Sequence, residues 1–95
     1  MPIDYRPPWY ELRDGSQRAA LQKRYEREIS EQHPLWGRQG IVIGKNAATD
    51  DVLVKLADGR FAIVHLTWAA SPGDASHPSA TLYSSDAEAS LGMAE

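Results

Sequence analysis

Two apolar segments on either side of Asp58-Gly59 constrain the fold of this chain more than any other feature. The segments, 52–56 (VLVKL) and 61–68 (FAIVHLTW), are rich in β-branched, aliphatic and aromatic residues. An Asp-Gly dipeptide between two such segments is a strong signal for a β-hairpin, and a two-residue type I′ turn is its common form. We therefore predict an antiparallel hairpin with Asp58 and Gly59 as its two loop residues.

This turn type sets the register of the predicted hairpin. With a two-residue loop, Val52 opposes His65 and Asp50 opposes Thr67, and directly opposed residues share a face of the sheet. Both faces of the hairpin are then mainly apolar, so each face needs a cover. A helix supplies one cover. The N-terminal arm, a curled sheet or a partner supplies the other.

Residues 15–32 have the pattern of an amphipathic helix. Leu21, Tyr25 and Ile29 recur at four-residue intervals and give a narrow apolar stripe. Asp14 is placed to cap the N-terminus of this helix. A proline shortly after the segment ends it, because the residue before a proline disfavours helical geometry.

The remaining segments complete one α+β domain over residues 1–95. Residues 1–13 form an arm rich in proline and aromatic residues, 39–83 an antiparallel sheet, and 84–95 a weak helix or tail. We predict the N-terminal helix packed on a β-meander of three or four strands, with closure into a small SH3-like barrel as an option.

Composition argues against several kinds of site. The chain has no cysteine, and its 13 acidic and 10 basic side chains give a net charge of −3. Disulfides and thiolate metal ligands are therefore excluded, and bulk charge does not favour nucleic acid or an anionic membrane as partner. His33, His65 and His77 lack the spacing of metal ligands, so we expect no metal and no cofactor.

The hydropathy pattern carries no sign of a membrane protein. The longest apolar stretch, residues 61–70, is much shorter than the ~20 residues that a spanning helix needs. The first residues lack the apolar core of a secretory signal. We expect a cytoplasmic protein without a membrane partner.

A longer sequence signature resembles that of a group of small bacterial proteins of unassigned function. That signature reads DDVL…L-x-DGR-x-A-x-V-H-L-T-W, and Pro78 and Tyr83 match a later proline and tyrosine. The stretches that carry the resemblance are 33–38 (HPLWGR), 50–54 (DDVLV) and 58–68 (DGRFAIVHLTW). The resemblance implies a bacterial source and no particular activity.

The polar end of the hairpin, with Asp50, His65 and Thr67, is the best candidate for catalysis. In the predicted register Asp50 faces Thr67, and His65 lies diagonal to Asp50. An imidazole beside a carboxylate is the arrangement of a general base, and Thr67 or a bound water would give up the proton. No nucleophile motif or oxyanion loop accompanies these residues, so mutual hydrogen bonding is the simpler interpretation and we assign no catalytic residue.

Aromatic and basic residues suggest two kinds of binding. The aromatic residues that could contact a partner are Trp9, Tyr10, Trp36 and Trp68; the basic residues that could contact nucleic acid are Arg18, Lys23, Arg24 and Arg27. Interleaved glutamates such as Glu28 favour a salt-bridged helix surface over a nucleic-acid surface. We predict a non-enzymatic binding module that acts through a protein partner or self-association. Nucleic-acid binding is the alternative, and a small enzyme using His65 is less favoured.

Overall fold

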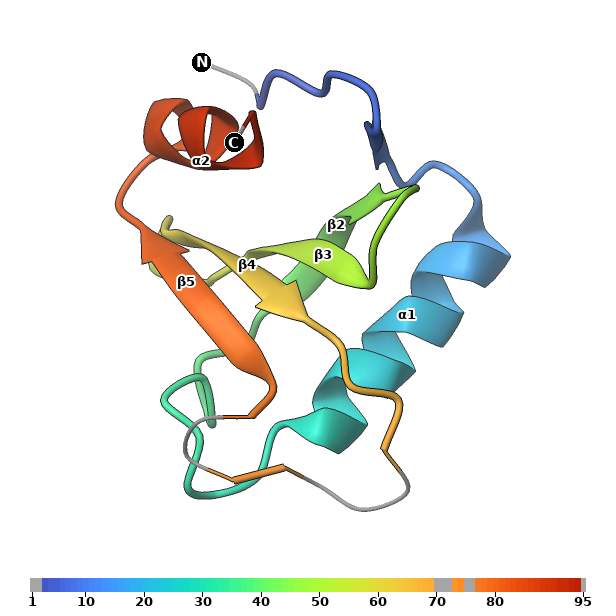
Figure 1. Cartoon of the computed structure of the whole chain (residues 1–95). Helices are drawn as coiled ribbons and strands as arrows, with labels where there is room; N and C mark the ends of the chain where they lie inside the picture. Colours follow the sequence, from blue (N-terminus) through green and yellow to red (C-terminus); the bar gives the residue numbers. More distant parts are fainter. Residues whose placement is uncertain (1–2, 70–72, 75–76, 95) are drawn as a thin grey trace.

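A five-stranded antiparallel sheet forms the centre of the molecule in the computed structural model, which describes residues 3–69, 73–74 and 77–94 (Figure 1). The strands lie in the order β1-β2-β3-β4-β5, and β1 and β5 are the two edges, so the sheet is open and not a barrel. The strands are β1 (Trp9–Glu11), β2 (Ile41–Asn46), β3 (Asp51–Lys55), β4 (Phe61–His65) and β5 (Ser79–Tyr83). The α+β class is confirmed.

The strand missing from the sequence prediction is β1, which lies within the proline-rich arm. Pro7 and Pro8 precede the strand, so their missing N–H groups cost no ladder bond. The carbonyl of Pro8 instead accepts a hydrogen bond from the N–H of Ala47 (2.8 Å). Residues 1–2 of the arm and residue 95 of the predicted C-terminal segment lie outside the described residues.

Two helices flank the sheet, α1 (Gly15–Glu28) and α2 (Asp86–Met93). Asp14 caps α1 as predicted, because its carboxylate accepts from the N–H groups of Ser16 (2.8 Å) and Gln17 (3.2 Å). The prediction that this helix continues to residue 32 is wrong, since Ile29 takes extended geometry (φ −83°, ψ 113°) and is buried in the core. A following proline limits only the residue before it, so it marks the last permitted end of a helix and not the actual one.

Each face of the sheet has its own hydrophobic cluster, as the two apolar faces of the hairpin predict. α1 covers one face, where its Leu21 and Tyr25 pack with strand residues such as Val54. α2 and the N-terminal arm cover the other face, where Met93 and Trp9 join Leu53. Figure 1 shows the two helices on separate sides of the sheet, with the arm passing beside α2.

The β3–β4 hairpin forms, but its turn differs from the prediction. The loop has three residues, Ala57 to Gly59, because the carbonyl of Leu56 accepts from the N–H of Gly59 (3.0 Å) and the N–H of Leu56 donates to the carbonyl of Arg60 (2.8 Å). Only Gly59 has a positive φ (+89°), whereas a type I′ turn needs positive φ at both of its central residues. The Asp58 carboxylate accepts from the Arg60 N–H (3.0 Å) and supports the longer loop.

The longer loop shifts the register by one residue, so the predicted pairing of Asp50 with Thr67 and of Val52 with His65 is wrong. Val52 pairs with Val64, and Asp51 pairs with His65. A one-residue shift moves the side chains of one strand to the other face. Asp51 is therefore the carboxylate directly opposite His65, in place of the predicted diagonal neighbour Asp50.

Candidate functional site

Trp68 is held in an unusual backbone conformation just after β4. Its φ is +57°, in the left-handed region that a bulky L-residue rarely adopts. The residue is nevertheless 52% exposed, so the conformation does not serve to bury the indole. A residue in this region persists only where its surroundings hold it in place.

Buried Glu28, the last residue of α1, holds this segment. The Glu28 side chain is only 1% exposed and accepts four hydrogen bonds. Oε1 accepts from the backbone N–H (2.7 Å) and the hydroxyl (3.0 Å) of Thr67. Oε2 accepts from the backbone N–H of Trp68 (2.9 Å) and from Nε of Arg24 (2.7 Å). Four donors require a group that only accepts, and an ionised carboxylate is such a group.

The electrostatics of Glu28 follow from these bonds. Burial alone would raise the pKa of Glu28, but the hydrogen bonds from Thr67, Arg24 and Trp68 together hold that pKa below its ordinary value. Hydrogen bonds donated to the charged form of an acid favour ionisation. Glu28 is therefore an ionised carboxylate inside the fold at neutral pH.

This lowered pKa predicts that part of the folding stability is lost at acid pH, and that Glu28→Gln removes this pH dependence. A carboxylate whose pKa is lower in the folded than in the unfolded state stabilises the fold above its unfolded pKa, near 4.5. That contribution is lost as pH falls through the folded pKa. Urea unfolding of both proteins between pH 6 and pH 3 measures this effect. The free energy of unfolding of the wild type is expected to exceed that of Glu28→Gln at pH 6, and this difference is expected to shrink as the pH falls to 3. A constant difference across this range would contradict the assignment.

Two further side chains contact the Trp68 indole. The guanidinium of Arg24 lies over the ring, 5.2 Å from its centroid, and also donates to the carbonyl of Ala69. A cation over an indole face is a favourable contact. Asp50 Oδ1 accepts from the indole Nε1 (3.3 Å). The indole is thus oriented by one cation and one carboxylate while half of it remains exposed.

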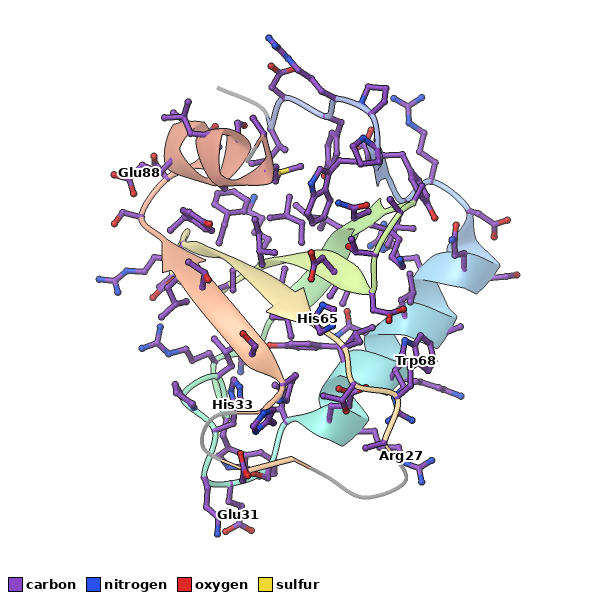
Figure 2. The ribbon with its side chains drawn as sticks, viewed as in Figure 1. Arg27, Glu31, His33, His65, Trp68 and Glu88 are labelled. Atoms are coloured by element: carbon purple, nitrogen blue, oxygen red, sulfur yellow. The ribbon has the colours of Figure 1, made fainter. Side chains whose placement is uncertain are left out.

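His65 and Asp51 lie at the end of β4 and the start of β3, next in sequence to the segment that carries Trp68 and to Asp50. Nδ1 of His65 lies 2.8 Å from Oδ1 of Asp51, and the His65 side chain is 56% exposed. The enzyme hypothesis requires that solvent can reach His65, and this position meets that requirement. Figure 2 shows His65 and Trp68 on the same stretch of chain, where β4 ends and the following segment begins.

The three residues singled out for catalysis are close in the fold but are not arranged as a proton relay. His65 is paired with Asp51, and Asp50 accepts a hydrogen bond from the indole N–H of Trp68. The hydroxyl of Thr67 donates to Glu28 and accepts from the N–H of Ala69 (3.2 Å), so its proton is already engaged. The contact that a general base needs with Thr67 is not among the hydrogen bonds of the described residues.

The four aromatic residues predicted to bind a partner lie in different environments. Trp9 is 6% exposed and belongs to the core. Tyr10 is partly buried, and its hydroxyl accepts from Nε2 of Gln17 (2.7 Å). Trp36 is 54% exposed in the turn after α1, and its exposure matches that of Trp68. Of these four residues, Trp68 is the one that is exposed and whose ring is also contacted by Arg24 and Asp50.

The basic residues predicted for nucleic acid are also divided. Arg18, Lys23 and Arg27 are exposed on α1. Arg24, in contrast, has a side chain only 14% exposed and is engaged with Glu28 and Trp68. The basic surface of α1 therefore lacks Arg24.

The described residues hold no group of three or more side chains placed to bind a metal ion. In the same part of the chain, neither helix is long and apolar enough to cross a membrane. The sequence resemblance to small bacterial proteins stays a prediction. The chain matches no protein-family model, no curated protein and no solved structure.

Proposed function

We propose that this protein is a small non-enzymatic binding module that contacts a protein partner through a surface centred on Trp68. We call this the Trp68 surface and define it by Trp68, Arg24, Asp50, Asp51 and His65. A bacterial source and a cytoplasmic location belong to the same proposal. The observation that supports it most is an exposed indole on a left-handed backbone that a buried carboxylate holds in place.

The energetic cost of this arrangement favours a binding role. A positive φ at Trp68 costs free energy, and burial of the Glu28 carboxylate costs more unless every donor around it is well placed. Ordinary folding would use a tryptophan to fill the core, as Trp9 does. Here the same residue type is oriented and left half exposed. Tryptophan is enriched among the residues that dominate the energy of protein interfaces.

The polar residues around Trp68 suggest the chemistry of the partner. Asp50 brings a carboxylate to the indole Nε1 (3.3 Å), and the exposed His65–Asp51 pair lies at the same end of the β3–β4 hairpin. Polar groups around an apolar centre are the usual composition of an interface rim. A partner with an apolar pocket bordered by basic or amide groups fits this surface.

Two tryptophans of equal exposure provide a matched test. The wild-type chain, Trp68→Ala and Trp36→Ala are each immobilised, and a lysate of the source cells is passed over them. Trp68 and Trp36 are 52% and 54% exposed. Both variants therefore lose a similar amount of non-specific hydrophobic binding. We expect Trp68→Ala to capture at least tenfold less of one particular protein than the wild type does. This corresponds to an interface residue that contributes about 1.4 kcal/mol or more to the binding free energy. Trp36→Ala should retain it. Equal capture by Trp68→Ala would contradict the proposal.

The alternatives have less support. For nucleic-acid binding, Arg24 is not available as a basic contact because it pairs with Glu28, and Trp9 is not available to stack on bases because it is buried. This alternative predicts affinity that falls steeply with salt, because neutralised phosphates release counterions. A gel shift at two salt concentrations that is unchanged by Trp68→Ala but lost on reversing the charge of Arg27 would favour it. The enzyme alternative retains the His65–Asp51 pair but has no nucleophile oriented towards it among the described residues.

A further inference from the structure

The outer edge of β5 is a row of backbone groups without a strand beside it. The hydrogen bonds from Leu66 N–H to the Asp50 carbonyl (3.1 Å) and from Leu56 N–H to the Arg60 carbonyl (2.8 Å) direct the even-numbered residues of β4 towards β3. Because backbone groups alternate along a strand, the odd-numbered residues of β4 bond to β5. They pair there with the odd-numbered residues of β5.

The even-numbered residues of β5 therefore direct their backbone away from the sheet. Two neighbours of this edge are already bonded, since the carbonyl of Pro78 lies 2.7 Å from Nε2 of His33 and the N–H of Ser84 donates to a side chain of α2 (3.0 Å). Between them, the N–H and C=O groups of Ala80 and Leu82 have no hydrogen-bond partner within the described residues. The edge thus offers two donors and two acceptors.

The usual protection of an edge strand is missing from β5. Its five residues, Ser79–Tyr83, include no charged residue and no proline. Proteins blunt free edges with short strands, charges or prolines, because such edges pair readily with other strands. The opposite edge, β1, has two of these features: it is three residues long and ends in the charged Glu11, whereas a proline directly precedes both edge strands.

A hollow of mixed polar and apolar lining lies beside this edge, on the face of the sheet that α1 covers. It has a volume of about 230 Å³. Its lining includes apolar Pro34, Leu35 and Ala80 together with His33 and Ser79. Leu82 borders the same hollow and is itself 41% exposed. The edge therefore carries both an exposed apolar side chain and a place that could receive one.

We propose that two copies of this chain pair antiparallel through their β5 strands, about a two-fold axis at Thr81. Ala80 of each copy then opposes the partner's Leu82, and the four free groups of each edge form four hydrogen bonds with those of the other. Residues opposed in this way share a face. Each Leu82 side chain therefore enters the hollow beside Ala80 of the other copy.

The edge fits a second copy because it is self-complementary. An isologous contact requires one patch to carry both halves of every interaction. This patch does so for its backbone donors and acceptors and for Leu82 with its hollow. It also carries no charge that would repel its own copy. The pairing does not involve the Trp68 surface, so either proposal can fail without the other.

Sedimentation of the full chain from micromolar to millimolar concentration tests this pairing. We expect a wild-type dimer that dissociates on dilution. Leu82→Lys removes the inserted side chain and adds a charge, so it should raise the dissociation constant tenfold or more. Leu91→Lys is the matched control, because Leu91 is an exposed leucine (70%) on α2, and it should dimerise as the wild type does. A monomeric wild type, or a folded Leu82→Lys chain that dimerises as before, would overturn the proposal.

Ala80→Pro provides a second test that spares the intramolecular ladder. The N–H of Ala80 points outward, so a proline there removes only an edge donor. We expect this variant to weaken the dimer as well. Hydrogen exchange of the wild type needs no variant: the Ala80 and Leu82 amides should become protected as concentration rises, while the Thr81 amide is protected throughout. A dimer in which the Ala80 and Leu82 amides stay unprotected would also overturn the proposal.

Discussion

Replacing Glu28 by alanine is expected to lower the free energy of unfolding by about 3–5 kcal/mol, as is typical when one partner of a buried ion pair is removed. The variant leaves the Thr67 and Trp68 N–H groups without their acceptor and Arg24 without its counter-charge. Urea denaturation followed by circular dichroism measures the change. The expected loss is a large fraction of the stability of a domain of this size.

Glu31→Ala is the control for this prediction. Glu31 is also a glutamate near the end of α1, but it is exposed (Figure 2). Substitutions at such surface positions usually change stability by about 0.5 kcal/mol or less. If both alanine variants unfold at similar urea concentrations, Glu28 does not have the structural role described above.

Replacing His33 by alanine is expected to lower the free energy of unfolding by about 2–4 kcal/mol, because it leaves two buried backbone groups without partners. Nδ1 of His33 accepts from the N–H of Leu35 (3.1 Å), which leaves the proton on Nε2 for the carbonyl of Pro78 (2.7 Å). The imidazole thus joins the turn after α1 to the start of β5. Thermal and urea unfolding measure the loss.

His77→Ala is the matched control for His33→Ala. His77 also precedes a proline, but its side chain is 65% exposed and lies beside Asp74. We expect this variant to unfold close to the wild type. A His33→Ala protein as stable as His77→Ala would show that the buried imidazole is dispensable.

The hairpin illustrates how far the sequence predicts this fold. Asp58-Gly59 correctly indicated a turn between two strands, but the dipeptide fits two loops. In one loop both residues have positive φ, and in the other only the glycine does. The second loop forms. The choice depends on how the flanking strands pack, so the identity of the carboxylate opposite His65 could not be obtained from local sequence.

Glu28 was missed because charged residues were assigned to the solvent side of α1. Its spacing did carry a signal: it lies seven residues after Leu21 and next to Ile29, on the stripe that faces the core. A carboxylate on such a stripe indicates buried donors that need an acceptor. Those donors, the N–H groups of Thr67 and Trp68, lie about 40 residues further along the chain, so only the tertiary fold brings them to Glu28.

Amide hydrogen exchange at Thr67 and Trp68 tests most directly whether Glu28 holds the Trp68 surface in place. Both amides lie beyond the end of β4 and donate to a side chain, not to a neighbouring strand. At neutral pH the wild-type chain is expected to protect them about as well as the amides of β4 itself. Exchange at the rate of an unfolded chain would contradict the account, because the indole would then have no fixed backbone to present it.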